Sequence, residues 1–212
     1  MNDLVRIFPD APAIVLWRNP LAIIGSILAT WGGAGGRWNL QHFRLDLYEE
    51  NYEEALERLS PEWIEKLSPE TQARIAMVAA IARERLGDHE GAHAAAEANR
   101  AYLEPQVDRF PRRGLFRACL AVALAQLGRR EEALAQAGLA VGQGGGDAYI
   151  GPRIIEIQAM VDALLGRHRE AVDHLARLLK TSYRASITKT DLRLDPAWKA
   201  LREDRGFKNL LR

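Results

Sequence analysis

The residues of this sequence best suited to chemistry are two histidines and a glutamate near the middle of the chain. They stand in His89-Glu90-Gly91-Ala92-His93, which has the HExxH spacing of zinc-dependent hydrolases. On a helix, two histidines four residues apart share one face and can bind zinc, while the glutamate activates a water molecule. The spacing therefore allows a zinc-dependent hydrolase as one hypothesis.

The surroundings of this motif favour a structural explanation instead. Gly87 and Asp88 precede it and Gly91 lies within it, which is typical of a turn between two helices. No obvious third ligand stands out, although Glu97 and Glu104 lie downstream. We therefore predict no metal, no cofactor and no catalytic residue, and we keep the zinc-dependent hydrolase as the alternative function.

The remaining reactive side chains also have simple structural explanations. His42, His168 and His174 have neither ligand spacing nor an adjacent nucleophile that would suggest a triad. Cys119 is the only cysteine and lies in the apolar run of residues 115–127. We expect it to be a small buried hydrophobic residue rather than a reactive thiol.

Composition and charge narrow the classes of partner. Hydrophobic residues make up 48% of the 212 residues and charged residues 27%, as in soluble globular proteins. The net charge of +1 is not the basic footprint of nucleic-acid recognition, so no nucleic-acid partner is expected. The sequence starts without the pattern of a secretory signal, which makes the cytoplasm the default expectation.

The most apolar segment, residues 13–31, is interrupted by Arg18, Asn19 and Pro20. A membrane span requires about 20 predominantly apolar residues, so we expect a core helix here and no membrane span. Residues 20–31 carry apolar side chains around most of the helix circumference. An exposed patch of this kind usually marks an interaction site. We therefore expect residues 13–31 to pack against a second copy of the chain or an upstream signalling domain.

Helical periodicity dominates the rest of the chain. From Pro69 onward apolar positions return every three or four residues in long runs, each closed by a glycine, and the alternation typical of strands is almost absent. Three segments, residues 86–92, 127–133 and 165–171, share the order Leu-Gly, four residues, Ala. A degenerate fourth copy at residues 49–55 has glutamate in place of the glycine.

This repeated segment describes a turn between two antiparallel helices. Its glycine can adopt the left-handed conformation that ends the first helix, and its alanine lets the second helix approach closely. Such a pair leaves one face uncovered, so neighbouring pairs must stack. The sequence therefore predicts an all-α fold of stacked helix pairs.

The repeated segments resemble tetratricopeptide repeats, whose turn has the same Leu-Gly-x-x-x-x-Ala pattern. The match is best at residues 127–133 and 165–171 and weaker at 86–92. The resemblance implies a right-handed superhelical solenoid of stacked antiparallel helix pairs over residues 37–180. The turn glycines are 41 and 38 residues apart, more than the family period of about 34 residues, so longer loops are expected between the repeats.

The end of the chain carries a second resemblance. Residues 192–207 resemble the closing segment of the repeat regions found in bacterial multidomain signalling proteins. Asp195 can cap a helix that begins at Pro196. The apolar residues expected to seal the last repeat are Trp198, Leu201, Phe207, Leu210 and Leu211. We therefore divide the chain into an apolar N-terminal edge with a glycine-rich connection (1–36), the repeats (37–180) and a C-terminal cap (181–212).

The resemblance implies a non-catalytic scaffold that binds a peptide, a helix or a domain of another protein through a groove or through its N-terminal edge. Arginines interleaved with apolar residues suit a partner with acidic and hydrophobic character, although they could also simply solvate an exposed face. The residues expected to line the groove are Arg37, Arg44, Tyr48, Arg74, Met77, Ile81, Arg85, Val122, Gln126, Arg153, Glu156 and Met160.

Overall fold

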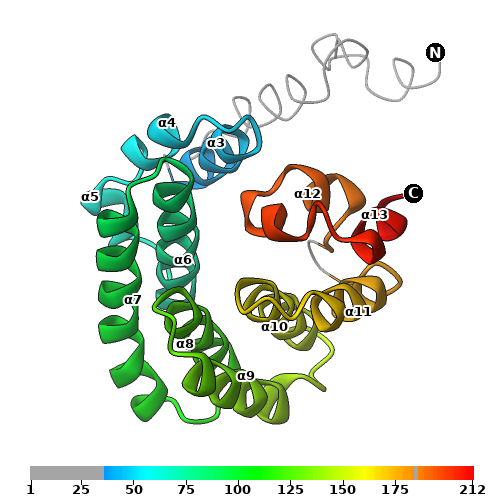
Figure 1. Ribbon diagram of the computed structural model, residues 1–212. Coiled ribbons are helices and arrows are strands. Elements are labelled where there is room, and N and C mark those ends of the chain that lie inside the picture. The colour runs from blue at the N-terminus through cyan, green and yellow to red at the C-terminus, as the bar shows by residue number, and fades with distance from the viewer. Residues whose placement is uncertain (1–35, 184–185) are drawn as a thin grey trace, which may run out of the picture. The chain divides into compact units, whose positions relative to one another are not determined.

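Helices are the only regular secondary structure in the described part of the chain (Figure 1). The computed structural model describes the backbone of residues 36–183 and 186–212, and the side chains from residue 40 onward. The prediction of an all-helical fold is confirmed for these residues. None of the helices in this part is long and apolar enough to cross a membrane.

The helices follow one another with short connections. In chain order they are α3 (Gly36–Tyr48), α4 (Tyr52–Glu57), α5 (Pro61–Ile64), α6 (Pro69–Arg85), α7 (His89–Arg109), α8 (Gly114–Gln126), α9 (Arg130–Gly144), α10 (Gly151–Leu164), α11 (His168–Leu178), α12 (Lys189–Leu194), the 3-10 helix η1 (Pro196–Leu201) and α13 (Arg205–Leu211). The chain divides into two compact units, Met1–Gln41 and His42–Arg212. The second unit therefore includes residues 42–180 of the expected repeats, which were predicted to begin at residue 37, together with the expected C-terminal cap. It is described below by itself.

The repeated turns join α6 to α7, α8 to α9 and α10 to α11, and the two helices of each pair pack against each other. Gly87, Gly128 and Gly166 have φ angles of +78°, +74° and +72°. After each glycine the next N–H donates to the carbonyl five residues earlier, as from Arg129 to Leu124 at 2.9 Å. This is a Schellman motif, which ends the first helix of each pair. The predicted meeting points at the three glycines are confirmed.

The degenerate upstream copy forms the same turn without a glycine. Glu50 has a φ of +62°, a conformation that few residues other than glycine adopt. The N–H of Asn51 donates to the carbonyl of Asp46 at 2.8 Å, the same hydrogen bond as in the other three turns. The turn geometry therefore repeats a fourth time between α3 and α4.

Neighbouring pairs pack through a regular set of contacts. The second helix of each pair contacts the first helix of the next, as α4 does with α6, α7 with α8 and α9 with α10. The alanine of each of the three repeated segments is buried, at Ala92, Ala133 and Ala171. Because alanine has so small a side chain, the helices approach closely and one apolar cluster runs from α6 to α11.

The C-terminal segment (residues 187–212) folds into α12, η1 and α13 with strong local caps. Thr188 and Asp191 form a capping box at α12. Asp195 accepts a hydrogen bond from the N–H of Ala197 at 2.9 Å, with Pro196 at the first position of η1. The predicted cap at Asp195 is therefore confirmed, although the element that it begins is a 3-10 helix.

We predict opposite stability effects for alanine at two glycines. Gly128→Ala should destabilise the fold by about 1 kcal/mol because an L residue is strained in the left-handed conformation. Gly138→Ala is the matched control: Gly138 lies inside α9 with open space where an added methyl group would stand, and alanine there should stabilise the helix by about 0.5–1 kcal/mol. Urea unfolding monitored by circular dichroism measures both. Equal effects of the two changes would contradict the turn geometry.

Candidate functional site

The C-terminal segment packs on the side of the first helices where the sequence places a groove. η1 contacts both α6 and α10, two helices that are separated in sequence by the whole of α7, α8 and α9. We call this side of α3, α6, α8 and α10 the covered face. Its members from the predicted groove are Arg44 and Tyr48 of α3, Arg74, Met77, Ile81 and Arg85 of α6, Val122 and Gln126 of α8, and Arg153, Glu156 and Met160 of α10.

The apolar members of the covered face belong to the core of the second unit. Met77, Ile81, Val122 and Met160 are buried in the same cluster as the side chains of the C-terminal segment. Trp198 of η1 is only 1% exposed in this cluster. The apolar part of the predicted groove is therefore occupied by the chain itself.

Asp191 of α12 is the first polar anchor of the C-terminal segment. The hydroxyl of Tyr48 donates to Asp191 Oδ1 at 2.7 Å, and Arg44 Nη2 lies 3.4 Å from the same oxygen. Arg44 also donates to the Tyr48 hydroxyl at 2.6 Å. Burial opposes the charge of Asp191, but hydrogen bonds from Thr188 and Tyr48 outweigh it and hold the pKa of this carboxyl below its ordinary value.

The second anchor is a backbone carbonyl. Arg85 at the end of α6 donates from Nη2 to the carbonyl of Pro196 at 3.3 Å. Beside it, burial raises the pKa of Asp195 from 3.8 to about 6, against the opposing effects of the Ala197 N–H and of Arg44. This hydrogen bond joins Arg85 to a main-chain atom and therefore does not depend on the side chain of residue 196.

The third group of charges comes from α10. Arg153 donates from Nη1 to Glu156 at 2.7 and 2.6 Å, and the hydroxyl of Tyr183 donates to Glu156 Oε2 at 3.3 Å. Arg74 of α6 lies close enough to interact electrostatically with both Arg153 and Glu156. Its pKa is lowered by burial and by the repulsion of Arg153. The fold thus brings α3, α6 and α10 arginines to one side of the second unit.

The other predicted groove residues have different surroundings. Gln126 is half-buried and donates to the carbonyl of Met77 at 2.9 Å, so it ties α8 to α6. Arg37 lies in α3, but its side chain is outside the described part. The N-terminal patch expected at residues 13–31 also lies outside the described residues.

Sequence reasoning missed Asp191 as a partner of Arg44 and the Pro196 carbonyl as a partner of Arg85. Both lie in a segment whose pattern indicates a cap for the last repeat alone, whereas η1 also reaches α6, the first helix of the first complete pair. The available signal was charge complementarity between arginines on the first helices and carboxylates beside an apolar tail.

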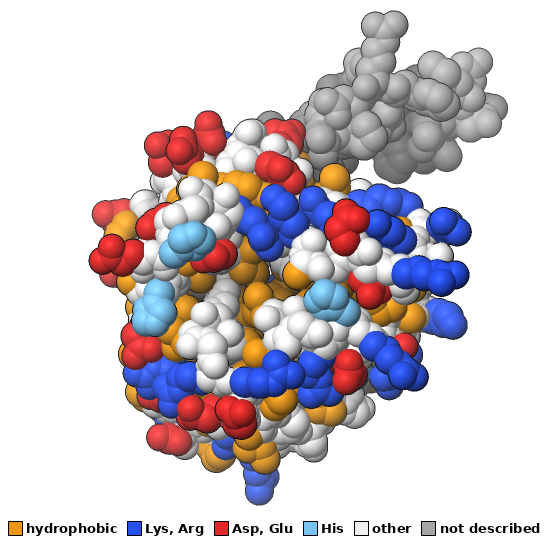
Figure 2. Space-filling view, viewed as in Figure 1, with side chains coloured by type: hydrophobic (Ala, Val, Ile, Leu, Met, Phe, Trp, Pro, Cys, Tyr) orange, Lys and Arg blue, Asp and Glu red, His pale blue; other side chains and the backbone are white. Residues whose placement is uncertain are grey.

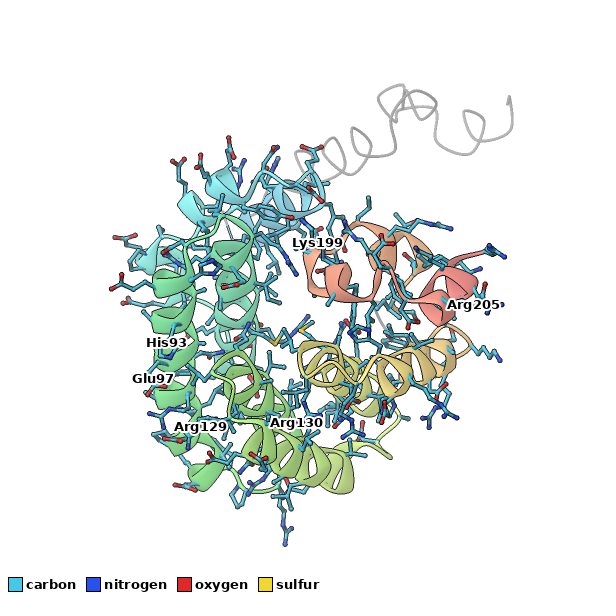
Figure 3. The ribbon with its side chains drawn as sticks, in the orientation of Figure 1. His93, Glu97, Arg129, Arg130, Lys199 and Arg205 are labelled. Carbon is cyan, nitrogen blue, oxygen red and sulfur yellow. The ribbon has the colours of Figure 1, made fainter. Side chains whose placement is uncertain are left out.

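The HExxH residues stand apart from the covered face. His89 and His93 are exposed near the start of α7, and Figure 3 shows His93 and Glu97 on α7 with Lys199 of η1 on the other side of α6. His89 Nδ1 lies 2.9 Å from Glu84 Oε1, and this hydrogen bond raises the pKa of His89. Within residues 36–183 and 186–212, no group of three or more His, Cys, Asp or Glu side chains could hold a metal ion.

Cys119 lies in the middle of α8 and is fully buried. Burial raises the pKa of its thiol to about 12, which keeps it protonated at neutral pH. The expectation of a buried hydrophobic cysteine is confirmed.

Comparisons with known proteins give no relative for this chain: no family model matches the sequence, and no curated protein or solved structure matches it significantly.

We predict a pH-dependent stability difference between the wild type and Asp195→Asn. The raised pKa of Asp195 means that its contribution to stability is fully present below about pH 4 and is lost as the pH rises through about 6. Relative to the asparagine variant, which preserves the cap, the wild type should lose on the order of 2 kcal/mol between pH 4 and 7. Urea unfolding at several pH values measures this.

Asp147→Asn provides a control of opposite sign. Hydrogen bonds from the N–H groups of Ile150 and Tyr149 lower the pKa of Asp147, so its contribution is present at neutral pH and is lost as the pH falls. Parallel pH profiles for the wild type and Asp195→Asn would contradict the assignment of the shift to Asp195.

We also predict that His89 and His93 bind no structural or catalytic zinc. The double variant His89→Ala, His93→Ala should have the same melting temperature with and without a chelator, as should the wild type, because His89 already has a carboxylate partner in Glu84. Elemental analysis of the purified protein is the second measurement. Stoichiometric zinc in the wild type that is lost in the double variant would favour the hydrolase.

Proposed function

We propose that this protein is a non-catalytic protein-interaction scaffold built from tetratricopeptide-like repeats stacked as a right-handed superhelical solenoid. Its covered face recognises a short protein segment that combines carboxylates with a large apolar side chain. The Leu-Gly-x-x-x-x-Ala turns and the contacts between successive pairs support the repeat assignment. Zinc-dependent hydrolysis at His89 and His93 stays the alternative, to be decided by the metal experiment above.

The observation that carries the proposal is the way in which the covered face holds the C-terminal segment. It uses three kinds of contact that suit peptides in general: a carboxylate against Tyr48 and Arg44, a main-chain carbonyl against Arg85, and a buried indole at Trp198. The same contacts would recognise a segment of another protein with similar chemistry. The C-terminal segment is then an intramolecular ligand, and its sequence indicates which type of segment the covered face prefers.

The apolar contacts supply most of the affinity in this arrangement. Full burial of side chains such as Trp198 and Leu201 contributes about 1.5–3 kcal/mol each. The pair between Asp191 and the exposed Arg44 contributes less than about 1 kcal/mol because water screens it. The polar contacts therefore set the position of the bound segment, and the indole holds it there.

A partner must compete with a ligand that is part of the same chain. The effective concentration of such a tethered segment is on the order of millimolar, so a free segment of equal intrinsic affinity binds only weakly. Partners of the covered face are expected to bind through a stronger apolar anchor or at a high local concentration. Changes that loosen the C-terminal segment should therefore increase binding in trans.

We predict that the Trp198→Ala variant of the 212-residue chain binds a labelled peptide of residues 187–204 at least tenfold more tightly than the wild type does. Removing a buried aromatic side chain costs about 3–5 kcal/mol of packing, which weakens the hold on the resident segment. Fluorescence anisotropy measures the affinity, and circular dichroism checks that the variant keeps its helices.

Lys199→Ala is the matched control, because Lys199 lies on the same 3-10 helix with an exposed side chain. It should bind the peptide as weakly as the wild type. A peptide with alanine in place of the tryptophan should not bind the Trp198→Ala variant. Absence of peptide binding to a folded Trp198→Ala variant would argue against a peptide-binding covered face.

A further inference from the structure

A second concave surface lies on the opposite flank of the first complete helix pair. It is an open cleft of about 380 Å³ between α4, α5, α6 and α7. The larger apolar side chains that line it are Leu56, Leu59, Ile64, Ile75 and Tyr102. None of these residues belongs to the covered face, so the cleft is a separate surface.

The cleft arises because one helix is too short. The second helix of each pair contacts the first helix of the next pair, and α4 has that place against α6. However, α4 has 6 residues, whereas α7 has 21 and α9 has 15. A helix of fewer than two turns cannot cover the flank of α6 and α7, and the uncovered part is the cleft.

The floor of the cleft suits a helix. Ala76 and Ala79 of α6 and Ala95 and Ala98 of α7 line it, and side chains this small allow another helix to approach to the usual axis separation of about 8–10 Å. Asn99 also lines the cleft and is 3% exposed. Its Nδ2 donates to the carbonyl of Ala73, and its Oδ1 has no hydrogen-bond partner in the described chain. Because this acceptor is itself buried, the floor presents mainly apolar surface to a partner.

Residues 53–65 of α4, α5 and their connection, which contribute Leu56, Leu59 and Ile64 to the lining, form the rim of the cleft on this side. The exposed carboxylates of the rim are Glu53, Glu54, Glu57, Glu62 and Glu65. Among the described residues, none of these five has an ion-pair partner. The charged residue of the lining itself is Arg83 of α6, which is already paired with Asp88 at 2.9 Å. Figure 2 shows acidic side chains gathered at this end of the second unit, whereas Lys and Arg side chains gather over α12 and α13. A basic partner would be attracted to this rim.

We infer that the cleft binds an amphipathic, basic helix of a partner protein. The apolar face of this helix lies on the alanines of α6 and α7, in the space that a full-length second helix would fill. Its lysines or arginines face the glutamates of α4 and α5. This inference goes beyond the proposed function, because the cleft and the covered face share no residue and bind partners of opposite charge.

The test uses the full chain and three synthetic peptides of 14 residues. The first is a helix of leucine, alanine and lysine with leucines at i, i+3, i+4 and i+7. The second has glutamate in place of lysine, and the third is a scrambled form of the first that lacks an apolar face. Isothermal titration calorimetry should detect binding of the first peptide, with affinity at least tenfold above that of the other two.

Variants locate the binding to the cleft. Ala98→Arg adds bulk and positive charge on the exposed side of α7 and should weaken binding of the lysine peptide at least tenfold. Ala135→Arg, at an exposed position of α9, is the matched control and should leave the affinity unchanged. The double change Glu53→Gln, Glu57→Gln alters only the rim and should weaken binding, with a smaller effect in high salt.

Three outcomes would overturn the inference: no binding of the lysine peptide at millimolar concentration, equal binding of the scrambled peptide, or equal binding to Ala98→Arg. The peptide of residues 187–204 distinguishes this failure from that of the proposed function. Its binding to Trp198→Ala depends on the covered face and should not change when Ala98→Arg is added.

Discussion

Each helix pair in this chain leaves an apolar flank that it cannot cover by itself. The pairs are closed by Schellman turns at Gly87, Gly128 and Gly166, which force the second helix back along the first. Two antiparallel helices of this length bury only the seam between them. The rest of the fold follows from how the remaining flanks are covered, by the next pair, by the C-terminal segment or only in part.

The covered face shows one solution to this constraint. Trp198 and Leu201 of η1 are buried against the first helices α6 and α10, whereas Phe207 of α13 is buried beside α11. Charged groups enter the same region, and burying a charge is costly unless it is paired. Asp191 is paired, and its pKa falls, whereas Asp195 is more strongly affected by burial and its pKa rises. The same region of the fold therefore lowers the pKa of Asp191 and raises the pKa of Asp195.

The flank beside α4 shows a less complete solution. The turn at Glu50 reproduces the geometry of the glycine turns, so the chain begins a second helix in the usual place. That helix stops after six residues, and α5 is shorter still. One flank of the second unit is therefore covered by an aromatic tail and the other only by two short acidic helices. These two departures from a regular array create the surfaces at which we propose binding.

Local patterns in the sequence were sufficient to determine the helices and their turns. The Leu-Gly-x-x-x-x-Ala pattern predicts where the two helices of a pair meet. Its glycine ends the first helix in the left-handed conformation and its alanine allows close approach of the second helix, and both effects involve only residues close together in the sequence. The capping role of Asp195 could be predicted for the same reason. Even Glu50, a poor residue for this conformation, was placed by its similarity to the glycine copies.

Only the tertiary structure decided which surfaces are open. η1 contacts both α6 and α10, which are separated by the whole of α7, α8 and α9, and no local pattern encodes contacts over that distance. Arg85 and Pro196, or Tyr48 and Asp191, likewise meet across more than a hundred residues. The sequence by itself therefore determined the helix pairs and their arginine-bearing first helices. The packing of the whole unit decided that its own C-terminal segment covers them, because η1, which carries the buried Trp198, packs against α6 and α10 at once.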